Sequence, residues 1–264
     1  MTANPLSNSE MERYERNISV SWFSKESQIK LKQSSVLVVG AGGLGSPAIM
    51  YLASAGVGNL GIADFDKAGL SNLQRQIIHK ENYLGKSKTE SAKRFVKDIN
   101  SDINVIEINE KITMENGENL LCDFDFIIDA TDNAITKSVI NDLCVKLKKP
   151  YTHGSVQDTN GMIFSYIPDM VKKKDESEFE DSPCYRCLIH DIDRPGNLEF
   201  SGKGVLGPVC GIIGSMQALE AIKYLSGRRD LITGKVKFFD FLNYSNQDIE
   251  FGFSRKCKFH NTKI

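Results

Sequence analysis

Residues 35–45 have the sequence Ser-Val-Leu-Val-Val-Gly-Ala-Gly-Gly-Leu-Gly, which is the strongest indication of the fold in this chain. Its first five residues form a short β-branched run, which is typical of a strand that is buried on both faces. The next six match the pattern Gly-x-Gly-x-x-Gly, directly before an apolar segment that we expect to be helical. Glycines let the backbone approach a phosphate closely, and a helix N-terminus presents free N–H groups to an anion. The glycines of this predicted phosphate-binding turn are Gly40, Gly42, Gly43 and Gly45.

Strands and helices continue to alternate on both sides of this turn. We expect helices over residues 9–32, 87–99 and 134–147, and strands over 60–63, 104–108 and 124–129. This alternation predicts an α/β fold, with a Rossmann-like, mostly parallel sheet and helices on both of its faces.

The pattern changes after Pro150, where strands are no longer separated by helices. We expect strands over 151–156, 162–167, 235–240 and 248–253, a surface loop over 169–182, and a helix over 212–225. These strands would be antiparallel and extend the same sheet. We therefore expect one continuous domain with an N-terminal helical arm at 1–32, a nucleotide-binding part at 33–150, and a sheet extension with a crossover loop and a metal site at 151–264.

The bulk composition is that of an ordinary globular protein. The 264 residues carry a formal net charge of −1, so charge alone does not indicate a nucleic acid or a membrane surface as partner. No apolar run approaches the ~20 residues that span a bilayer, and the polar first residues do not resemble a signal peptide. The six cysteines are not spaced like a secreted disulfide framework. We expect a cytoplasmic protein.

Four charged residues bear on whether the bound nucleotide is NAD or ATP. Asp64 follows Gly45 by 19 residues, at the end of an expected strand, where an acid can bond ribose hydroxyls. Alone, this arrangement favours an NAD-dependent oxidoreductase. Arg75 and Lys88, however, offer cationic side chains to a triphosphate, and Asp132 offers a carboxylate that could hold Mg²⁺ at another strand end. We therefore favour ATP.

Several motifs occur in the order of a known family. They are Arg13-Tyr14-x-Arg16, the glycine turn, Asp64-Phe65-Asp66, the segment 71–76, Lys88, Thr131-Asp132-Asn133 and Cys184-x-x-Cys187. From about Arg13 to His260, the chain resembles the MoeB/ThiF/HesA family of ubiquitin-activating-enzyme-like adenylyltransferases. The resemblance implies a homodimer that uses ATP and Mg²⁺ to adenylate the C-terminal glycine of a ubiquitin-like sulfur carrier ending in Gly-Gly. Pyrophosphate would be released, and the carrier would serve molybdopterin or thiamine biosynthesis.

The resemblance also implies roles for individual residues. Asp64 would bind the ribose, Asp132 would hold Mg²⁺, and Arg16 would enter the active site of the partner subunit. The expected catalytic residues are Arg16, Arg75, Lys88 and Asp132. The expected nucleotide-binding residues are the four turn glycines, Asp64, Asp66, Asn72, Arg75, Gln76, Lys88, Thr131, Asp132 and Asn133.

Two short pairs of potential metal ligands lie far apart in the chain. They are Cys184-x-x-Cys187 and Cys257-x-x-His260, each with the spacing that lets one turn supply two ligands. Four such ligands complete a structural zinc site. The family commonly carries two C-x-x-C pairs, so His260 replaces an expected cysteine, and His190 is an alternative fourth ligand. A redox-active Cys184/Cys187 pair is a further alternative.

The stretch between His190 and Pro208, where some family members carry a catalytic cysteine, contains none. Cys210 lies where a small packing residue is expected. The resemblance then implies adenylation without an enzyme thioester, with sulfur from a separate persulfide donor. Two alternatives stay open besides the oxidoreductase: adenylation of a ribosomal peptide in a peptide-antibiotic pathway, and a binding protein without catalytic activity.

Overall fold

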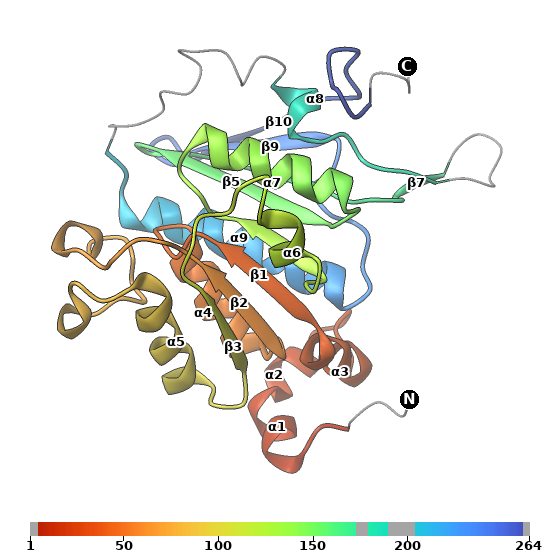
Figure 1. Cartoon of the computed structure of the whole chain (residues 1–264). Helices are drawn as coiled ribbons and strands as arrows, with labels where there is room; N and C mark the ends of the chain where they lie inside the picture. Colours follow the sequence, from red (N-terminus) through yellow and green to blue (C-terminus); the bar gives the residue numbers. More distant parts are fainter. Residues whose placement is uncertain (1–4, 173–178, 190–203, 261–264) are drawn as a thin grey trace.

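A computed structural model describes residues 5–172, 179–189 and 204–260 of the chain. Its centre is an eight-stranded sheet in the order β10-β9-β6-β5-β4-β1-β2-β3 (Figure 1). The strands of this sheet are β1 Ser35–Val39, β2 Asn59–Ala63, β3 Asn104–Ile108, β4 Phe126–Asp129, β5 Tyr151–Gln157, β6 Asn160–Tyr166, β9 Lys235–Asp240 and β10 Ser245–Glu250. A separate hairpin pairs β7 Val171–Lys172 with β8 Phe179–Glu180.

The sheet has a parallel and an antiparallel half. Strands β3, β2, β1, β4 and β5 pair in parallel, whereas β6, β9 and β10 follow as antiparallel strands beyond β5. The predicted α/β fold with an antiparallel C-terminal extension is confirmed. The chain order reverses between β1 and β4, so their carboxyl ends frame the crevice where ligands bind in open α/β sheets.

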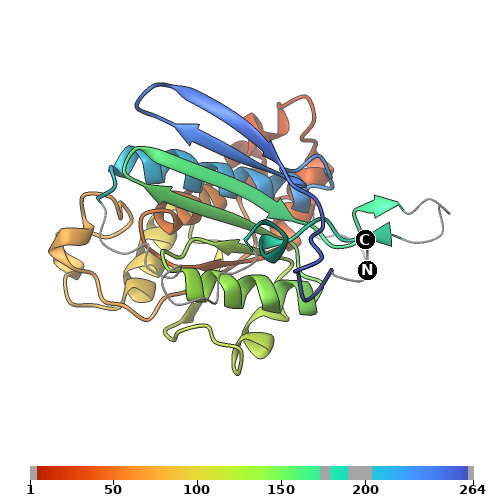
Figure 2. The same cartoon turned by 90° about the horizontal axis from the view of Figure 1, so that it is seen from above.

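Helices cover both faces of the sheet. On one face lie α4 Gly45–Ala55, α5 Lys88–Ile99 and α9 Gly207–Leu225, and on the other lie α6 Gly117–Leu121 and α7 Ala134–Lys146 (Figure 2). Strand β1 contributes side chains to the hydrophobic cores on both faces of the sheet. Val36 and Val38 pack into the core beneath α4 and α9, while Leu37 and Val39 pack into the core beneath α7. The continuous apolar run of β1 follows from this double burial.

The remaining short helices connect and flank these layers. They are α1 Asn8–Arg13, α2 Glu15–Ile18, α3 Lys25–Gln33, η1 Leu70–Asn72, η2 Glu81–Tyr83 and α8 Tyr185–Leu188. None of the helices within the described ranges is long and apolar enough to cross a membrane.

The segment predicted to be helical over residues 9–32 contains three separate helices, α1, α2 and α3, rather than continuous helix. Tyr14 lies at the first break, where its buried ring packs on Gly56 and its hydroxyl accepts a 2.9 Å hydrogen bond from Asn100. Ser24 begins α3 by accepting a hydrogen bond from the backbone N–H of Ser27. Tertiary anchoring and a local cap therefore override the helical periodicity.

The last predicted strand, over 248–253, is displaced in the structure. Strand β10 occupies Ser245–Glu250, because its register with β9 pairs Ser245 with Asp240 across a short turn. Phe251 and Phe253 instead pack against the core beneath α7. The predicted loop over 169–182 contains the short strands β7 and β8, and α9 begins at Gly207 rather than at Ile212.

Candidate functional site

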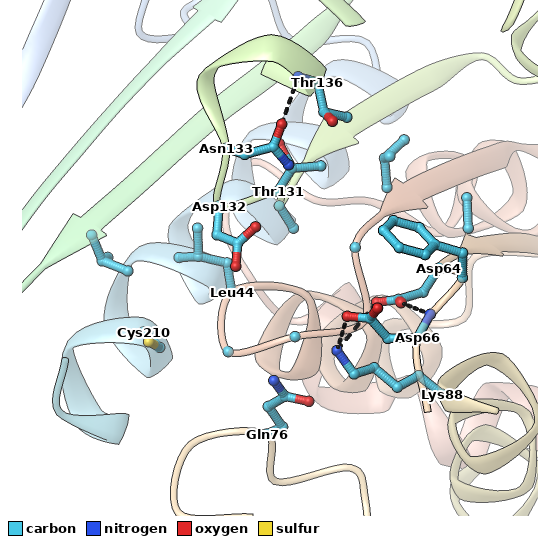
Figure 3. A pocket seen from close by; sticks show the side chains of 18 of the residues that line it. Leu44, Asp64, Asp66, Gln76, Lys88, Thr131, Asp132, Asn133, Thr136 and Cys210 are labelled. Atoms are coloured by element: carbon cyan, nitrogen blue, oxygen red, sulfur yellow. Dashed lines mark hydrogen bonds and ion pairs between the residues drawn. The ribbon is translucent and has the colours of Figure 1, made fainter. Parts of the chain in front are cut away.

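A pocket of about 450 Å³ opens at the carboxyl ends of the parallel strands (Figure 3). The turn after β1, the segment after β2 and the segment after β4 form its walls, together with the first residue of α5. The predicted site residues that line this pocket are Gly40, Gly42, Gly43, Asp64, Asp66, Arg75, Gln76, Lys88, Thr131, Asp132 and Asn133. The fold therefore brings most of the predicted nucleotide-binding residues together.

The glycine turn needs its glycines for two different reasons. Gly40 has a φ of +98°, and a Cβ there would lie 2.7 Å from the backbone oxygen of Ala130. A Cβ on Gly45 would overlap the carbonyl oxygen of Gly40, so Gly45 allows α4 to begin against the turn. Gly40 forms part of the pocket wall, whereas Gly45 supports the turn from behind.

Asp64 and Lys88 form a charged corner of the pocket. The carboxylate of Asp64 accepts hydrogen bonds from the backbone N–H groups of Ala41, at 2.8 Å, and Asp66, at 2.9 Å. The buried ammonium of Lys88 lies 3.0 Å from Asp66 Oδ2 and 3.9 Å from Asp64 Oδ2. The aspartates thus hold Lys88 at the pocket wall, where an anionic ligand could compete for it.

Asp132 presents an exposed carboxylate to the same pocket (Figure 3). The neighbouring Asn133 caps α7, since its side-chain oxygen accepts a 2.9 Å hydrogen bond from the backbone N–H of Thr136. Within the described parts of the chain, Asp132 has no hydrogen-bond partner of its own. Its carboxylate is therefore available to a ligand rather than used as a helix cap.

Three predicted site residues lie outside the pocket wall formed by the described residues. The side-chain oxygen of Asn72 accepts a 2.9 Å hydrogen bond from the N–H of Gly69 and so stabilises the loop that carries Arg75. Arg16 is exposed on α2, and Gly45 lies behind the glycine turn. Arg75 itself lines the pocket and donates a 3.1 Å hydrogen bond to the backbone oxygen of Ser71.

The structure adds site residues that the sequence did not indicate. His79 is buried, and its ring nitrogens lie 2.9 Å from the backbone oxygen of Ala41 and 2.9 Å from Ser91 Oγ. Burial lowers the pKa of His79, so a neutral ring fastens the glycine turn to α5. Further lining residues are Glu110, Lys111, Ser155, Gln157 and Val205. The first four follow or end predicted strands, a signal that could have found them.

A buried ionic network lies directly behind the segment after β4. Asp129 Oδ2 lies 2.8 Å from His153 Nδ1 and 3.3 Å from Lys137 Nζ, and all three side chains are buried. Lys137 also donates a 2.7 Å hydrogen bond to the backbone oxygen of Gly154. Burial opposes ionisation of Asp129, but the Lys137 charge and the His153 hydrogen bond outweigh it and hold the pKa well below its usual range. Asp129 is therefore an ionised, structural acid.

The two ligand pairs meet in one buried cluster. The sulfur atoms of Cys184 and Cys257 are 3.7 Å apart, and His260 Nδ1 lies 3.6, 3.3 and 3.5 Å from the sulfurs of Cys184, Cys187 and Cys257. All four ligand atoms lie within 4.8 Å of one another, and the four residues are buried. Such separations match the edges of a tetrahedron around a metal with metal–ligand bonds of about 2.0–2.3 Å. The alternative ligand His190 lies outside the described residues.

Both turns of this cluster are fastened to α7 through one acid. Arg186, inside the Cys184/Cys187 turn, donates to Asp142 at 2.6 and 2.8 Å. Lys258, inside the Cys257/His260 turn, donates to the same carboxylate at 2.6 Å. The Cys/His cluster is thereby joined to the helix that begins immediately after Asp132 and Asn133.

Cys210 is a wall residue of the pocket, in the first turn of α9, and its thiol packs against Gly43. It is almost completely buried, and burial raises the pKa of its thiol. A buried thiol with a raised pKa is a poor nucleophile at neutral pH.

Comparisons with known proteins identify a family that matches nearly the whole chain. A model of the ThiF family matches residues 14–259. Adenylyltransferase and sulfurtransferase MOCS3 of Aedes aegypti is 41% identical over 238 residues, which are 90% of this chain and 52% of that protein. Adenylyltransferase and sulfurtransferase MOCS3-1 of Zea mays is 44% identical over 232 residues, 88% of this chain and 47% of that protein. The chain thus spans about half the length of these curated relatives.

Solved structures share the fold. Microcin C7 biosynthetic enzyme MccB in complex with N-formylated MccA has a TM-score of 0.81 and 24% identity, covering 93% of this chain and 74% of that one. The structure of Escherichia coli MccB with ATP has a TM-score of 0.80 and 24% identity, covering 94% and 74%. At these identities, the likeness establishes a common architecture.

Proposed function

The chain belongs to the ThiF family, and on that premise we propose that it uses ATP to adenylate the C-terminal carboxylate of a ubiquitin-like sulfur carrier. The observation that carries the proposal is the 41–44% identity to named adenylyltransferases over about nine-tenths of the chain. The pocket agrees with it, because cationic and acidic side chains meet there at a phosphate-binding turn.

The proposed reaction is an in-line displacement at the α-phosphorus of ATP. A carboxylate oxygen of the carrier's terminal glycine forms a bond to the α-phosphorus, while the bond from this phosphorus to the bridging oxygen of the β-phosphate breaks. Pyrophosphate leaves with the electron pair, and the products are an acyl-adenylate and pyrophosphate. A carboxylate is ionised at neutral pH, so the step needs no general base.

The charges in the pocket match this reaction. Asp64 would bind the ribose, and Arg75 and Lys88 would stabilise the negative charge that builds up on the phosphate oxygens. Lys88 would exchange its contact with Asp66 for a phosphate oxygen. Asp132, whose carboxylate is free, would hold Mg²⁺, which supplies further positive charge at the phosphates. Thr131 and Asn133 would fix the position of Asp132 on either side.

We propose that the Cys/His cluster holds a structural zinc ion. The support is its donor set of three sulfurs and one imidazole nitrogen, its burial, and ligand separations that suit a tetrahedron. A closed set of four protein ligands leaves no position for substrate. The ion would bind the turn at Cys184 to the C-terminal turn at Cys257 and stabilise the end of the fold.

We also propose a homodimer in which Arg16 acts in the partner's pocket. Its exposure on α2, away from the pocket of its own chain, supports this role. A groove of about 340 Å³ beside Arg16 contains the apolar residues Tyr51 and Leu219, each 49% exposed, on the outer faces of α4 and α9. An exposed apolar groove of this kind is typical of an interface.

Mixing two inactive variants tests the dimer. Arg16→Ala and Lys88→Ala would each abolish most adenylation alone. In a mixed dimer, one of the two sites regains both intact residues, so re-associated mixtures should recover about a quarter of wild-type activity. Absence of any recovery, with mixed dimers shown to form by native mass spectrometry, would contradict the proposed exchange of Arg16.

We further propose that the enzyme forms no thioester and that sulfur comes from a separate persulfide donor. The burial of Cys210 and the raised pKa of its thiol support this. A carrier conjugate on the wild-type protein that is missing from Cys210→Ala would contradict it.

A ribosomal peptide is the second candidate substrate. The observation that favours it is the fold shared with microcin C7 biosynthetic enzyme MccB, solved with N-formylated MccA. The identity of 24% there is well below the 41–44% to the adenylyltransferases that are also named sulfurtransferases. The carrier protein is therefore the preferred substrate.

Exchange of radiolabelled pyrophosphate into ATP tests the proposal and separates these substrates. Purified protein with Mg²⁺ would be assayed with each candidate carrier, intact or lacking its terminal glycine, and with candidate peptides. Exchange that requires a carrier and its terminal glycine supports the proposal. Exchange that occurs only with a peptide would identify the peptide, rather than the carrier, as the substrate. Absence of exchange with all of them would reject adenylation.

A further inference from the structure

A chain of side-chain contacts joins the Cys/His cluster to the nucleotide pocket, and His153 lies in the middle of it. We propose that His153 is a positioning residue that couples metal binding at the cluster to nucleotide binding at Asp132. This inference rests on the proposed function, because it presumes that the cluster holds a metal and that the pocket holds magnesium and a nucleotide.

The first link joins the cluster to His153. Tyr185 lies between Cys184 and Cys187 in sequence, so a metal on these cysteines fixes its backbone. Its ring stacks on the imidazole of His153, with ring centres 4.6 Å apart and planes inclined by 27°. The backbone N–H of Tyr185 also donates a 2.9 Å hydrogen bond to Asn141 of α7. The position of the Tyr185 ring is therefore determined jointly by the cluster and by α7.

The second link joins His153 to the segment after β4. Burial and the nearby Lys137 charge lower the pKa of His153 to about 4, so its ring is neutral at neutral pH. Its Nδ1–H then donates to Asp129 Oδ2 at 2.8 Å, because the ionised carboxylate can only accept. Within the described residues, His153 Nε2 has no hydrogen-bond partner. The imidazole thus has one hydrogen bond, to Asp129, and two ring contacts, with Tyr185 and with Phe164, whose ring centre lies 5.1 Å away. The contacts with Asp129 and Tyr185 form this path.

The third link reaches the pocket. The other oxygen of Asp129, Oδ1, accepts hydrogen bonds from the backbone N–H of Thr131 at 3.1 Å and from its hydroxyl at 2.6 Å. Thr131 and the adjacent Asp132 both line the pocket. A rotation of the Asp129 carboxylate would therefore move the backbone that carries Asp132.

These three links are continuous, with Tyr185, His153 and Asp129 buried and Thr131 half-buried, whereas the two sites that they join differ in exposure. The cluster is closed, and Asp132 is exposed in an open pocket. Metal binding would hold Tyr185 against His153, and His153 would hold Asp129 in the orientation that supports Thr131 and Asp132. Because coupling between two binding sites is reciprocal, nucleotide binding must then raise the equilibrium affinity of the cluster for its metal.

Reciprocity permits a test on the intact, zinc-loaded protein. The equilibrium affinity for zinc would be measured by competition with a colorimetric chelator, with and without Mg²⁺ and a non-hydrolysable ATP analogue, at nucleotide concentrations that calorimetry shows to be saturating. In the wild type, we expect nucleotide to raise the zinc affinity about five-fold or more, at the lower end of typical coupling between sites.

Two variants separately remove the hydrogen bond of His153 to Asp129 and its ring contact with Tyr185. His153→Phe keeps a ring for Tyr185 but loses the hydrogen bond to Asp129, while His153→Asn keeps a donor but loses the stacked ring. Each should reduce the nucleotide effect to less than about two-fold. The control is Thr152→Val on the same strand. It loses an equally buried 3.2 Å hydrogen bond to the backbone of Phe164, and it should keep the wild-type effect.

Each outcome decides the inference. A wild-type protein that binds nucleotide but keeps an unchanged equilibrium affinity for zinc has no coupling, and an effect that persists in both His153 variants does not depend on this residue. Either result overturns the inference while leaving the proposed function intact. If calorimetry detects no nucleotide binding, or if the purified protein binds no zinc, the proposed function is wrong. The inference is then rejected together with it. Thermal melting of each variant confirms that it is folded.

Discussion

The nucleotide pocket and the Cys/His cluster are built in opposite ways. The pocket is open, and its walls are short segments that follow successive strands, with much of the surface contributed by backbone and by charged side chains. The cluster is closed, and its ligands come from two turns that are 73 residues apart in sequence. Local chain geometry creates the first site, whereas the folding of the whole C-terminal half creates the second.

Because of this difference, we expect substitutions at one site to affect mainly catalysis and substitutions at the other to affect mainly stability. Substitutions in the pocket should reduce catalysis in a protein that still folds, because the pocket's charged groups contribute little to either core. Substitutions in the cluster should loosen the fold first, because the four ligands and Asp142 hold the C-terminal segment to α7. Variants at the two sites should therefore differ in whether stability or catalysis is lost.

Removing one ligand of the cluster should have the largest effect. Cys257→Ser should abolish stoichiometric zinc binding and lower the Tm by about 10 °C or more, since the binding free energy of a structural metal contributes to folding. Zinc content by mass spectrometry and thermal melting measure both. Cys122→Ser, at an exposed cysteine remote from the cluster, is the control and should change neither. Equal zinc content in the two variants would show that Cys257 is not a zinc ligand.

Removing Lys88, one of the cations that line the pocket, should reduce catalysis more than stability. Lys88→Ala should lower adenylation by about 100-fold or more, the scale of a lost charge at a transition state, while the Tm changes by only a few degrees. Pyrophosphate exchange and thermal melting would be measured together. Lys86→Ala, at an exposed lysine two residues earlier, should retain activity. Full exchange activity in Lys88→Ala would refute the role of Lys88.

The buried histidine between the two sites predicts a pH dependence of stability. With a folded pKa of about 4 against an ordinary value of 6.5, His153 binds a proton in the unfolded chain before it does so in the folded one. Stability is therefore lost as the pH falls through this window, by about 1.5 kcal/mol between pH 6.5 and pH 5. His153→Phe should flatten the curve by that amount in urea unfolding. Parallel curves for the two proteins would show that His153 does not titrate this way.

The smallest effect concerns the helix that carries Lys88. Ser87 caps α5 by accepting a 3.2 Å hydrogen bond from the N–H of Glu90. Ser87→Ala should cost about 1 kcal/mol of unfolding free energy and weaken nucleotide affinity only slightly. Urea unfolding would measure the cost, with Ser101→Ala beyond the end of the same helix as the unchanged control. A loss of affinity exceeding that of Lys88→Ala would show that the cap itself binds the ligand.

The same contrast explains what could be predicted from sequence. The apolar run of β1 and the glycines after it have local causes, so the strand, the turn and the position of Asp64 follow from a few neighbouring residues. The cluster was predictable because each ligand pair has a characteristic spacing, although 73 residues separate the pairs. The assembly of both sites agrees with the sequence analysis, and the chemical roles of the individual residues stay predictions.

The sequence could not reveal the contacts that depend on distant packing. His153 meets Tyr185 and Asp129 only because β5, β4 and the turn at Cys184 lie together, and no spacing encodes that meeting. His79 reaches Ala41 for the same reason. Tyr14 interrupts the predicted N-terminal helix because its partners, Gly56 and Asn100, lie on other elements. Such residues have ordinary local sequences and acquire their roles through tertiary structure.

Transfer of an oxygen isotope from the carrier to AMP would identify the adenylation step itself. A carrier whose terminal glycine carboxylate is enriched in oxygen-18 would be incubated with the protein, ATP, Mg²⁺ and a thiol that cleaves the acyl-adenylate. Attack of the carboxylate on the α-phosphorus predicts AMP that contains one carboxylate-derived oxygen-18 atom, detected by mass spectrometry, in amounts matching the acylated thiol. Unlabelled AMP, or acylated thiol without any AMP, would contradict adenylation of the carrier by this protein.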